Sequence, residues 1–261
     1  MPEPSDVARF YDRLAADYHL LYADWDASMS RQGAALDRII GAALGQGDDR
    51  GPFSVLDCSC GIGTQSIALG LRGHRVTGTD ISPSAAARAV REAALRDVPL
   101  RAAGADMRQL PFADGRFDVV LSADNSLPHL LSAPDVRAAL GEMRRVVRDG
   151  GLLVLSTRPY DEIRRTRPAS TLPQLAPAPG GRAVTFQLWD WHDDGEHYDL
   201  EHFQLVSDGP DWRVEVRRTS YWALTRRQLT GFVTEAGFAG PEWTEPERSG
   251  FFQPVLTARA L

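Results

Sequence analysis

The chain has 261 residues, of which 43% are hydrophobic and 25% are charged, so it can bury the core of one large domain or of a domain with an added cap. Its formal net charge of −6 and the lack of an evident basic face argue against nonspecific binding to nucleic acid. The sequence has no run of about 18 apolar residues, and residues 1–17 lack the pattern of a signal peptide. We therefore expect a cytoplasmic protein without membrane contact.

Apolar and aromatic side chains recur at helical spacing over residues 5–22, which predicts an amphipathic helix with Ser5 or Asp6 as its cap. Packing into the core is the ordinary role of such an aromatic face. A second helix is expected from about Ser30 to Leu44, and residues 45–52 form a polar, glycine-rich connection after it.

Residues 55–65 read as a buried strand that ends at Asp57, a turn that contains Gly61 and Gly63, and the start of a helix over residues 64–72. Glycine permits close approach of a ligand, and free N–H groups at a helix start favour a polar or anionic group. The stretch therefore predicts a site for a nucleotide-like ligand. A dinucleotide-binding turn would have a third glycine where this chain has Ser66, so the glycines alone do not identify the ligand.

Cys58 and Cys60 are the two cysteines of the chain. Their spacing is too short for an ordinary disulfide, and the nearest histidine, His74, lies on a different predicted element. We expect buried thiols beside the ligand and no metal site.

Acidic residues follow the next strands. Asp80 ends an apolar run over residues 74–80, where it could accept hydrogen bonds from ribose hydroxyls, and Asp106 precedes Met107 at a third strand end. Each acid taken alone could instead cap a helix or lie solvated in a loop. Three of them at successive strand ends favour a ligand site.

Strands and helices alternate beyond this point. A helix capped by Ser82 runs to Leu95, a fourth strand covers residues 117–123, a helix covers residues 134–148 and a further strand covers residues 152–156. This alternation predicts an α/β fold with a doubly wound parallel sheet and a ligand at the carboxyl ends of its strands.

The pattern changes after a proline-rich stretch over residues 168–181, which we expect to be a mobile loop. Residues 184–191 and 197–207 alternate like antiparallel strands around an Asp194-Gly195 turn. That turn pairs Trp191 with Tyr198 and Gln187 with His202, and it places His197 and His202 on opposite faces, which disfavours a three-histidine metal site. The remaining expected elements are a third strand over residues 212–222, a helix over residues 225–236 capped by Thr225, and a closing strand over residues 251–258.

The motifs D-x-x-x-G-x-G, a second strand ending in an acid, and an Asp106-Met107 pair together resemble the class I S-adenosylmethionine-dependent methyltransferases over residues 53–157. The resemblance implies a Rossmann-like, mostly parallel sheet of seven strands with an antiparallel hairpin cap. It implies S-adenosylmethionine as cofactor, with the glycines at its amino acid portion, Asp80 at the ribose and Asp106-Met107 at the adenine. It also implies an N-terminal lid in which Arg31 pairs with the carboxylate of the cofactor. The cofactor-binding set implied is Trp25, Arg31, Asp57, Cys58, Gly61, Gly63, Asp80, Ile81, Asp106, Met107 and Ala123.

Later residues are similar to the glycine and sarcosine N-methyltransferases. The stretches that match are N-S-x-x-H from Asn125 to His129, R-x-Y-D from Arg158, Ser220-Tyr221, and the long hairpin, although Trp222 stands where that subgroup tends to have tyrosine. The resemblance implies that Arg158 grips a substrate carboxylate, since its planar fork suits bidentate binding. The substrate would be a small amine that carries a carboxylate.

Each substrate-side residue has an alternative role. Arg158 could pair at the surface with Asp161 or Glu162. Asn125 could accept a hydrogen bond from the substrate amine through its side-chain oxygen, or merely end its strand. His129 could be a general base for O-methylation or a structural residue. Tyr160 and Tyr221 are expected to enclose the substrate, although such aromatic residues often belong to the core.

We therefore expect an N-terminal helical lid over residues 1–50, a cofactor-binding core over 51–160, an antiparallel cap over 161–224, and a helix with a closing strand over 225–261. The expected activity is N-methylation of a small amine or amino acid. The alternatives are a natural-product O- or C-methyltransferase, an enzyme that attacks another sulfonium carbon, and a non-catalytic cofactor-binding module. A redox enzyme is disfavoured by the incomplete dinucleotide turn.

Overall fold

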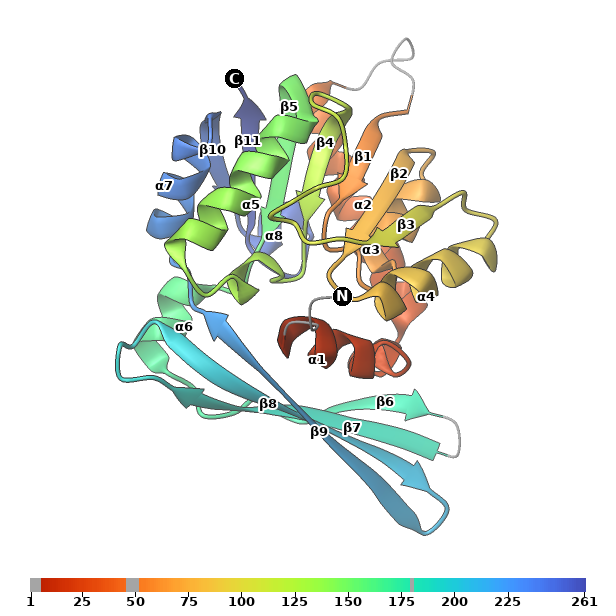
Figure 1. Ribbon diagram of the computed structural model, residues 1–261. Coiled ribbons are helices and arrows are strands. Elements are labelled where there is room, and N and C mark those ends of the chain that lie inside the picture. The colour runs from red at the N-terminus through yellow and green to blue at the C-terminus, as the bar shows by residue number, and fades with distance from the viewer. Residues whose placement is uncertain (1–5, 46–51, 179–180) are drawn as a thin grey trace.

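The computed structural model describes residues 6–45, 52–178 and 181–261, and it contains a seven-stranded and a four-stranded sheet (Figure 1). The larger sheet has the strand order β10-β11-β5-β4-β1-β2-β3. All its strands are parallel except β11, which runs antiparallel to both of its neighbours. The predicted mostly parallel, seven-stranded sheet is therefore confirmed. Its strands are β1 (Ser54–Asp57), β2 (Arg75–Asp80), β3 (Arg101–Gly104), β4 (Phe117–Ser122), β5 (Val147–Ser156), β10 (Phe238–Thr244) and β11 (Val255–Ala260).

Helices cover both faces of this sheet, as a doubly wound fold requires. Val55 packs with α2 (Trp25–Leu44), α3 (Thr64–Gly70) and α4 (Pro83–Ala94) on one face. Leu56, the next residue of the same strand, packs with α5 (Ala133–Val146) and α7 (Arg226–Glu235) on the other. Both residues are fully buried, which explains why the strand is apolar throughout.

Local signals placed the starts of several helices correctly. Ser82 caps α4 by accepting a hydrogen bond from the Ala85 N–H, and Thr225 forms a capping box with Gln228 at the start of α7. Within the described ranges, no helix combines the length and the apolar character needed to cross a bilayer.

The N-terminal prediction is partly wrong. The single helix expected over residues 5–22 is divided into α1 (Asp6–Leu14) and a 3₁₀ turn η1 (Tyr18–Leu21), and the possible cap Ser5 lies outside the described residues. The next helix begins at Trp25 rather than near Ser30, because Asp24 accepts a hydrogen bond from the Ala27 N–H and caps it there. Most of the connection expected over residues 45–52 also lies outside the described residues.

The four-stranded sheet contains β6 (Gln174–Ala178), β7 (Gly181–Trp191), β8 (His197–Asp208) and β9 (Asp211–Trp222). The pairings of Trp191 with Tyr198 and of Gln187 with His202 are those predicted from the turn. The loop expected over residues 168–181 is wrong where β6 pairs with β7. Proline within this stretch is tolerated because β6 is an edge strand.

The C-terminal prediction also needs correction. The closing strand begins at Val255 rather than at residue 251, and β10 was not predicted at all. A register shift between Ala239 and Glu242 interrupts the alternating pattern of β10, so its sequence does not look like a strand. Short elements complete the chain, namely η2 (Leu127–His129), α6 (Tyr160–Thr166) and α8 (Pro246–Ser249).

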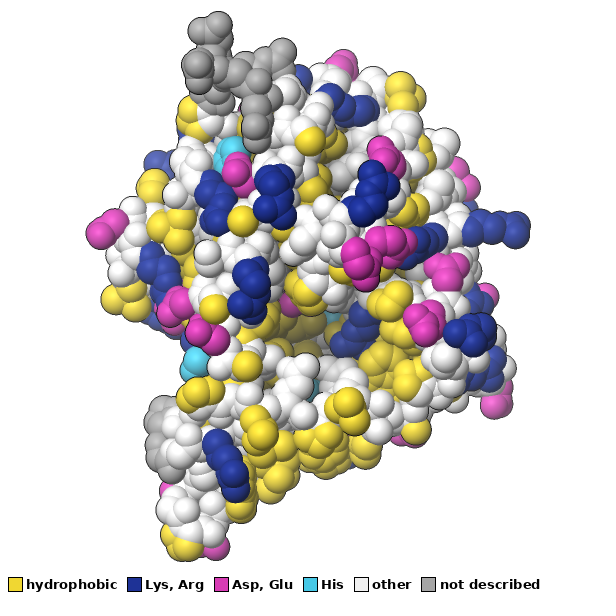
Figure 2. Space-filling view, turned by 180° about the vertical axis from the view of Figure 1, so that it is seen from behind, with side chains coloured by type: hydrophobic (Ala, Val, Ile, Leu, Met, Phe, Trp, Pro, Cys, Tyr) yellow, Lys and Arg dark blue, Asp and Glu magenta, His cyan; other side chains and the backbone are white. Residues whose placement is uncertain are grey.

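The four-stranded sheet lies across the end of the core at which β4 and β5 terminate, with α1 between the sheet and the core (Figure 1). Seen from behind, the surface is hollowed between these two parts, and hydrophobic side chains line the opening (Figure 2). We retain the predicted division into lid, core and cap as a proposal.

Candidate functional site

The site lies at the carboxyl ends of β1 and β4, which are neighbours in the larger sheet. The chain reaches the strands on the two sides of this pair through helices on opposite faces, so the loops after β1 and β4 part and leave room for a ligand. One cavity lies on the β1 side, and a larger one lies beneath the four-stranded sheet.

The smaller cavity, of about 270 Å³, brings together many of the side chains predicted to bind the cofactor. Tyr11 and Tyr18 reach it from the N-terminal segment, and His129 reaches it from η2. The predicted residues that line it are Cys58, Gly61, Asp80, Ile81, Asp106 and Met107.

Asp80 and Gly61 form the floor of this cavity. The Asp80 carboxylate accepts hydrogen bonds from the backbone N–H of Gly61 (2.7 Å) and of Ser82 (2.9 Å), which joins the turn after β1 to the end of β2. Burial raises the pKa of Asp80 to about 6. Gly61 has a φ of 51°, and a Cβ placed on it would meet no atom within 4 Å, so the space above it is open to a ligand.

The adenine-side residues Asp106 and Met107 also line this cavity. The Asp106 carboxylate pairs with Arg108 at 2.6 Å, and Arg108 bridges to Asp135. Although burial opposes it, Arg108 holds the pKa of Asp106 below its ordinary value. The acid therefore stays ionised at the rim.

Other residues predicted to bind the cofactor lie behind the cavity rather than along it. Asp57 is 1% exposed and accepts a hydrogen bond from the Ser66 hydroxyl at 2.7 Å. Gly63 has a φ of 96°, and a Cβ there would lie 2.8 Å from the Ile67 side chain, so this glycine serves helix packing. Ala123 is buried, and its carbonyl accepts a hydrogen bond from Ser126. The structure does not place these three among the residues that line either cavity.

Trp25 and Arg31 both lie in the first turns of α2. The Trp25 indole donates a hydrogen bond to the Thr64 hydroxyl at 2.9 Å and lies under the Arg96 guanidinium at 5.0 Å, so it fastens α2 to the start of α3. Arg31 lines the larger cavity and donates a hydrogen bond to the Ser28 hydroxyl. Its pairing with a cofactor carboxylate remains a prediction.

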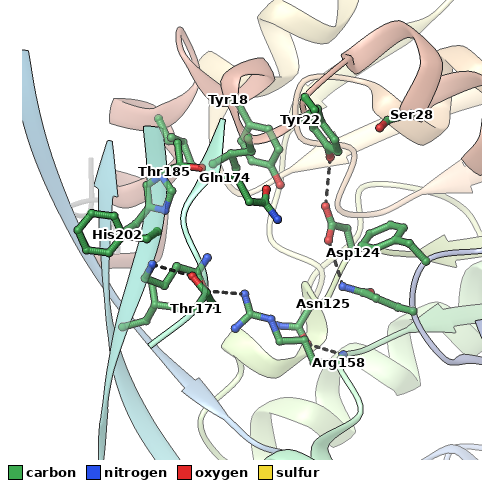
Figure 3. A pocket seen from close by; sticks show the side chains of 18 of the residues that line it. Tyr18, Tyr22, Ser28, Asp124, Asn125, Arg158, Thr171, Gln174, Thr185 and His202 are labelled. Atoms are coloured by element: carbon green, nitrogen blue, oxygen red, sulfur yellow. Dashed lines mark hydrogen bonds between the residues drawn. The ribbon is translucent and has the colours of Figure 1, made fainter. Parts of the chain in front are cut away.

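The larger cavity has a volume of about 790 Å³ and lies between the core and the four-stranded sheet. Its walls carry both aromatic and polar side chains, and the polar ones come from several elements (Figure 3). The residues that line it include Tyr18, Tyr22, Asp124, Asn125, Arg158, Thr185, His202 and Tyr221.

Arg158 extends from the end of β5 towards the four-stranded sheet (Figure 3). Its guanidinium donates hydrogen bonds to the Tyr198 hydroxyl (3.0 Å) and to the Gln187 side-chain oxygen (3.1 Å). It also lies 4.8 Å from the ring of Trp189 and 5.3 Å from that of Tyr221. In the described part of the chain no carboxylate pairs with it, so the surface ion pair with Asp161 or Glu162 is not formed.

Asn125 is oriented differently from our expectation. Its side-chain oxygen accepts a hydrogen bond from the backbone N–H of Arg158 at 3.1 Å, so this oxygen is not available for a substrate amine. Its side-chain nitrogen is buried and has no hydrogen-bond partner among the described residues. Asn125 therefore offers a donor rather than an acceptor.

Tyr160, which we expected to enclose the substrate, is 1% exposed and is not among the residues that line the cavity. Its hydroxyl lies 3.0 Å from that of Tyr198, which in turn holds Arg158. Tyr221 does line the cavity, with its ring 4.1 Å from that of His129.

His129 contacts both sides of the site. Its Nε2 lies 2.7 Å from the Tyr11 hydroxyl, and its Nδ1 lies 3.3 Å from the Thr219 hydroxyl. Burial lowers the pKa of His129 to about 3, so the ring is neutral near pH 7. These contacts connect α1 and β9 through η2.

Sequence reasoning assigned no role to Asp124 or His202, which both line the larger cavity. Asp124 directly precedes the N-S-x-x-H stretch, and this position next to a predicted site motif could have indicated that it lies in the site. His202 lies on β8, and its Nε2 is buried without a hydrogen-bond partner in the described structure. Only the position of the cap over the core reveals that His202 faces the site.

Comparison with known proteins relates the chain to methyltransferases. A family model described as "Methyltransferase domain" matches residues 55–151. The glycine/sarcosine N-methyltransferase of Parasynechococcus marenigrum (strain WH8102) is 38% identical over 141 residues, which cover 54% of this chain and 48% of that protein. The enzyme of the same name from Aphanothece halophytica is 33% identical over 141 residues, covering 54% and 51%. The chain thus spans about half the length of these curated relatives.

Solved structures agree over nearly the whole chain. DesVI of Streptomyces venezuelae superposes with a TM-score of 0.74 at 19% identity, covering 99% of this chain and 100% of that one. CalS10, an amino pentose methyltransferase from Micromonospora echinaspora, superposes with a TM-score of 0.72 at 21% identity, covering 94% and 95%. At such identities the likeness shows the fold alone. Residues 55–151 thus match a methyltransferase domain, and the fold of the chain, with its cavity at the end of β1, is that of the class I S-adenosylmethionine-dependent methyltransferases.

Proposed function

We propose that the protein transfers a methyl group from S-adenosylmethionine to the nitrogen of a small amine that carries a carboxylate. The observation that carries this proposal is the Arg158 guanidinium, a cation at the cavity without a carboxylate partner in the described structure. A partly desolvated cation favours an anionic ligand, since an ion taken out of water needs a compensating charge. A substrate carboxylate would supply it.

The surroundings of Arg158 suit a carboxylate. The guanidinium lies close to the rings of Trp189 and Tyr221, and Tyr198 and Gln187 fix two of its donors. The remaining N–H groups, together with the unpaired side-chain nitrogen of Asn125, are the donors left for an anion.

The cofactor would lie along Gly61 and Asp80, where the turn leaves open space and an acceptor carboxylate remains. When bound, its sulfonium supplies a methyl group that is already activated. The protein then has to orient the amine and exclude water, and positioning of this kind can contribute roughly 7–11 kcal/mol of the barrier. The relatives named glycine/sarcosine N-methyltransferases support glycine or sarcosine as acceptors. The cytoplasmic location expected from the sequence belongs to the same proposal.

A larger amine is a second candidate, because the cavity of about 790 Å³ is in the range that holds drug-sized ligands. Thr185 and His202 on the four-stranded sheet would offer polar contacts to its far end. The fold neighbour described as an amino pentose methyltransferase supports an amino sugar.

Arg158→Lys tests the proposal. It keeps the charge but removes the fork, so kcat/KM for a carboxylate-bearing amine should fall by well over tenfold, or more than about 1.4 kcal/mol. The measurement is transfer of labelled methyl groups to glycine, sarcosine, an amino sugar and a phenol. The exposed Arg165 provides the control variant Arg165→Lys, which should not change activity. An unchanged Arg158→Lys enzyme, or activity on phenols only, would instead indicate a natural-product O-methyltransferase.

A further inference from the structure

Asp124 presents an unpaired carboxylate to the larger cavity. One carboxylate oxygen accepts a hydrogen bond from the Tyr22 hydroxyl (3.3 Å), and the other accepts one from the Gln253 side-chain nitrogen (3.2 Å). Among the described residues no Lys, Arg or His lies within ion-pair distance of it. The cavity thus has a carboxylate as well as the Arg158 guanidinium on its wall.

The backbone at this point is strained. Asp124 and Asn125 have φ values of 56° and 66°, and each such left-handed residue other than glycine costs on the order of 1 kcal/mol. Hydrogen bonds from their N–H groups to the hydroxyl (2.8 Å) and the carbonyl (3.1 Å) of Ser156 hold this conformation. It directs Asp124 towards Tyr22 and leaves Asn125 beside Arg158 (Figure 3). The strain is thus held at the one turn that supplies both polar side chains.

We propose that Asp124 binds the ammonium group of the substrate and accepts the proton that this group must lose before methylation. The inference rests on the proposed function in one respect, namely that the acceptor atom is an amine nitrogen. An ammonium ion has no lone pair, so a proton first moves from the nitrogen to the Asp124 carboxylate. The nitrogen lone pair then bonds to the methyl carbon while the methyl–sulfur bond breaks and its electrons stay on sulfur. The product leaves as a methylated ammonium, and the Asp124 proton passes to solvent.

The surroundings of Asp124 suit this role. Burial raises the pKa of Asp124 to about 6, although Arg158 and the hydrogen bond from Tyr22 oppose the rise. The carboxylate is therefore ionised near pH 7 and is a better proton acceptor than an ordinary aspartate. The other titratable or charged groups that face it are Tyr11, Tyr18, Tyr22, Tyr221 and Arg158. Burial raises the pKa of each of these tyrosines, so none of them ionises near neutral pH.

Asp124 and Arg158 together make the cavity complementary to a zwitterion. A neutral phenol would leave both charges without partners, and an unpaired charge away from water is costly. A small amino acid in its ordinary zwitterionic form would satisfy both.

Asp124→Asn tests the inference, because the amide keeps the size of the side chain but cannot take a proton. The two acceptors compared are glycine, whose nitrogen is protonated near pH 7, and aminooxyacetate, whose nitrogen is not. We expect kcat/KM to fall about a hundredfold for glycine and to change little for aminooxyacetate. The acidic limb that Asp124 sets near pH 6 should also be lost for glycine, and the rate should instead rise at higher pH, where glycine itself loses its proton. Asp190→Asn, at an exposed position on β7, is the matched control.

Equal losses on both acceptors, or no loss on either, would overturn the inference. Tyr22→Phe is a second variant that leaves Asp124 in place. It removes a hydrogen bond that stabilises the carboxylate, so it should move the acidic limb to higher pH, and an unmoved limb contradicts the inference.

If the wild-type enzyme methylates neither acceptor, that result counts against the proposed function. The role of Asp124 in binding the ammonium group can then be tested by a binding experiment. Binding of ethylammonium and of acetate is then followed by NMR in the presence of S-adenosylhomocysteine. Ethylammonium should bind to the wild-type protein and to Arg158→Lys but not to Asp124→Asn, and a wild-type protein that does not bind it overturns the inference. A wild-type protein that binds ethylammonium but not acetate would contradict the carboxylate role of Arg158 in the proposed function and would leave the inference on Asp124 supported.

Discussion

Burial sets the ionisation of Asp57, the acid that ends β1. Its carboxylate accepts hydrogen bonds from the Ser66 hydroxyl (2.7 Å) and the Ser59 N–H (3.4 Å). These bonds favour the ionised form, but desolvation outweighs them and raises the pKa of Asp57 to about 7. Asp57 therefore holds the start of the glycine turn, but burial of its ionised carboxylate lowers the stability of the folded protein.

Asp57→Asn should remove that cost. The unfolded carboxyl has a pKa of about 3.9, so between pH 4 and 7 the folded chain keeps a proton that the unfolded chain has lost. The contribution of this group to stability therefore falls as the pH rises through that window. At pH 8 the free energy of unfolding of the variant should exceed that of the wild type by on the order of 1–4 kcal/mol, so the variant should melt at a higher temperature. This difference in stability should shrink towards pH 4. Thermal melts of the two proteins from pH 4 to 8 measure it, and a gap independent of pH would contradict this account.

The N-terminal helix α1 buries Ala8, Phe10 and Leu14, and polar contacts also hold it in place. Asp12 accepts hydrogen bonds from the Ser82 hydroxyl (2.5 Å) and the Ser84 N–H (3.2 Å) at the start of α4. Arg88 donates to the carbonyls of Ala15 (2.6 Å) and Ala16 (2.8 Å) just beyond the helix. These bonds place Tyr11 and Tyr18 over the cavity beside Asp80.

Asp12→Ala should loosen this lid. The loss of a capping carboxylate at a helix N-terminus costs about 1 kcal/mol, which corresponds to roughly fivefold weaker binding of the cofactor. Calorimetric titration with S-adenosylmethionine measures the effect. Asp12→Asn keeps an acceptor oxygen for these bonds and is the control, which should bind more tightly than Asp12→Ala. Equal affinity in the wild type and Asp12→Ala would show that the lid does not depend on this contact.

At the scale of the whole molecule, Arg217 joins the four-stranded sheet to the N-terminal segment. Its side chain is 3% exposed. It donates hydrogen bonds to the Gln204 side chain (2.8 Å), to Glu215 (2.6 Å) and to the Arg13 carbonyl (3.2 Å). Asp17 lies 3.8 Å away. This one buried guanidinium therefore links β9 to β8 and to the N-terminal segment.

Arg217→Ala should destabilise the protein by about 3 kcal/mol, because it leaves buried polar groups without their donor. The neighbouring Arg218 pairs with Glu201 on the other face of β9, and its side chain is 75% exposed. Arg218→Ala should therefore cost less than about 1 kcal/mol. Urea unfolding of both variants measures the difference. Similar losses in the two would show that the buried contacts of Arg217 do not stabilise the cap.

Features whose determinants lie a few residues apart were predictable from the sequence. The turn with Gly61, the caps Ser82 and Thr225, and the pairing of Trp191 with Tyr198 all depend on neighbours in the chain, and the structure has them as expected. The alternation of apolar strands with helices predicted the doubly wound sheet, because strands covered on both faces must be apolar throughout. The edge strand β6 and the irregular β10 have no such local pattern, and pairing with partner strands creates them.

The orientation of polar side chains depended on residues far away in the chain. The Asn125 side-chain oxygen accepts a hydrogen bond from the backbone N–H of Arg158, 33 positions later. The side-chain nitrogen of Asn125 is therefore the group left without a partner among the described residues. Tyr160 faces Tyr198, 38 positions later, rather than the cavity. Asp124 and His202 meet at the cavity only because the four-stranded sheet packs over the core. Sequence alone therefore determined the fold and the glycine turn, whereas only the tertiary structure decided which charges and unpaired donors line the larger cavity, since burial and long-range hydrogen bonds set these.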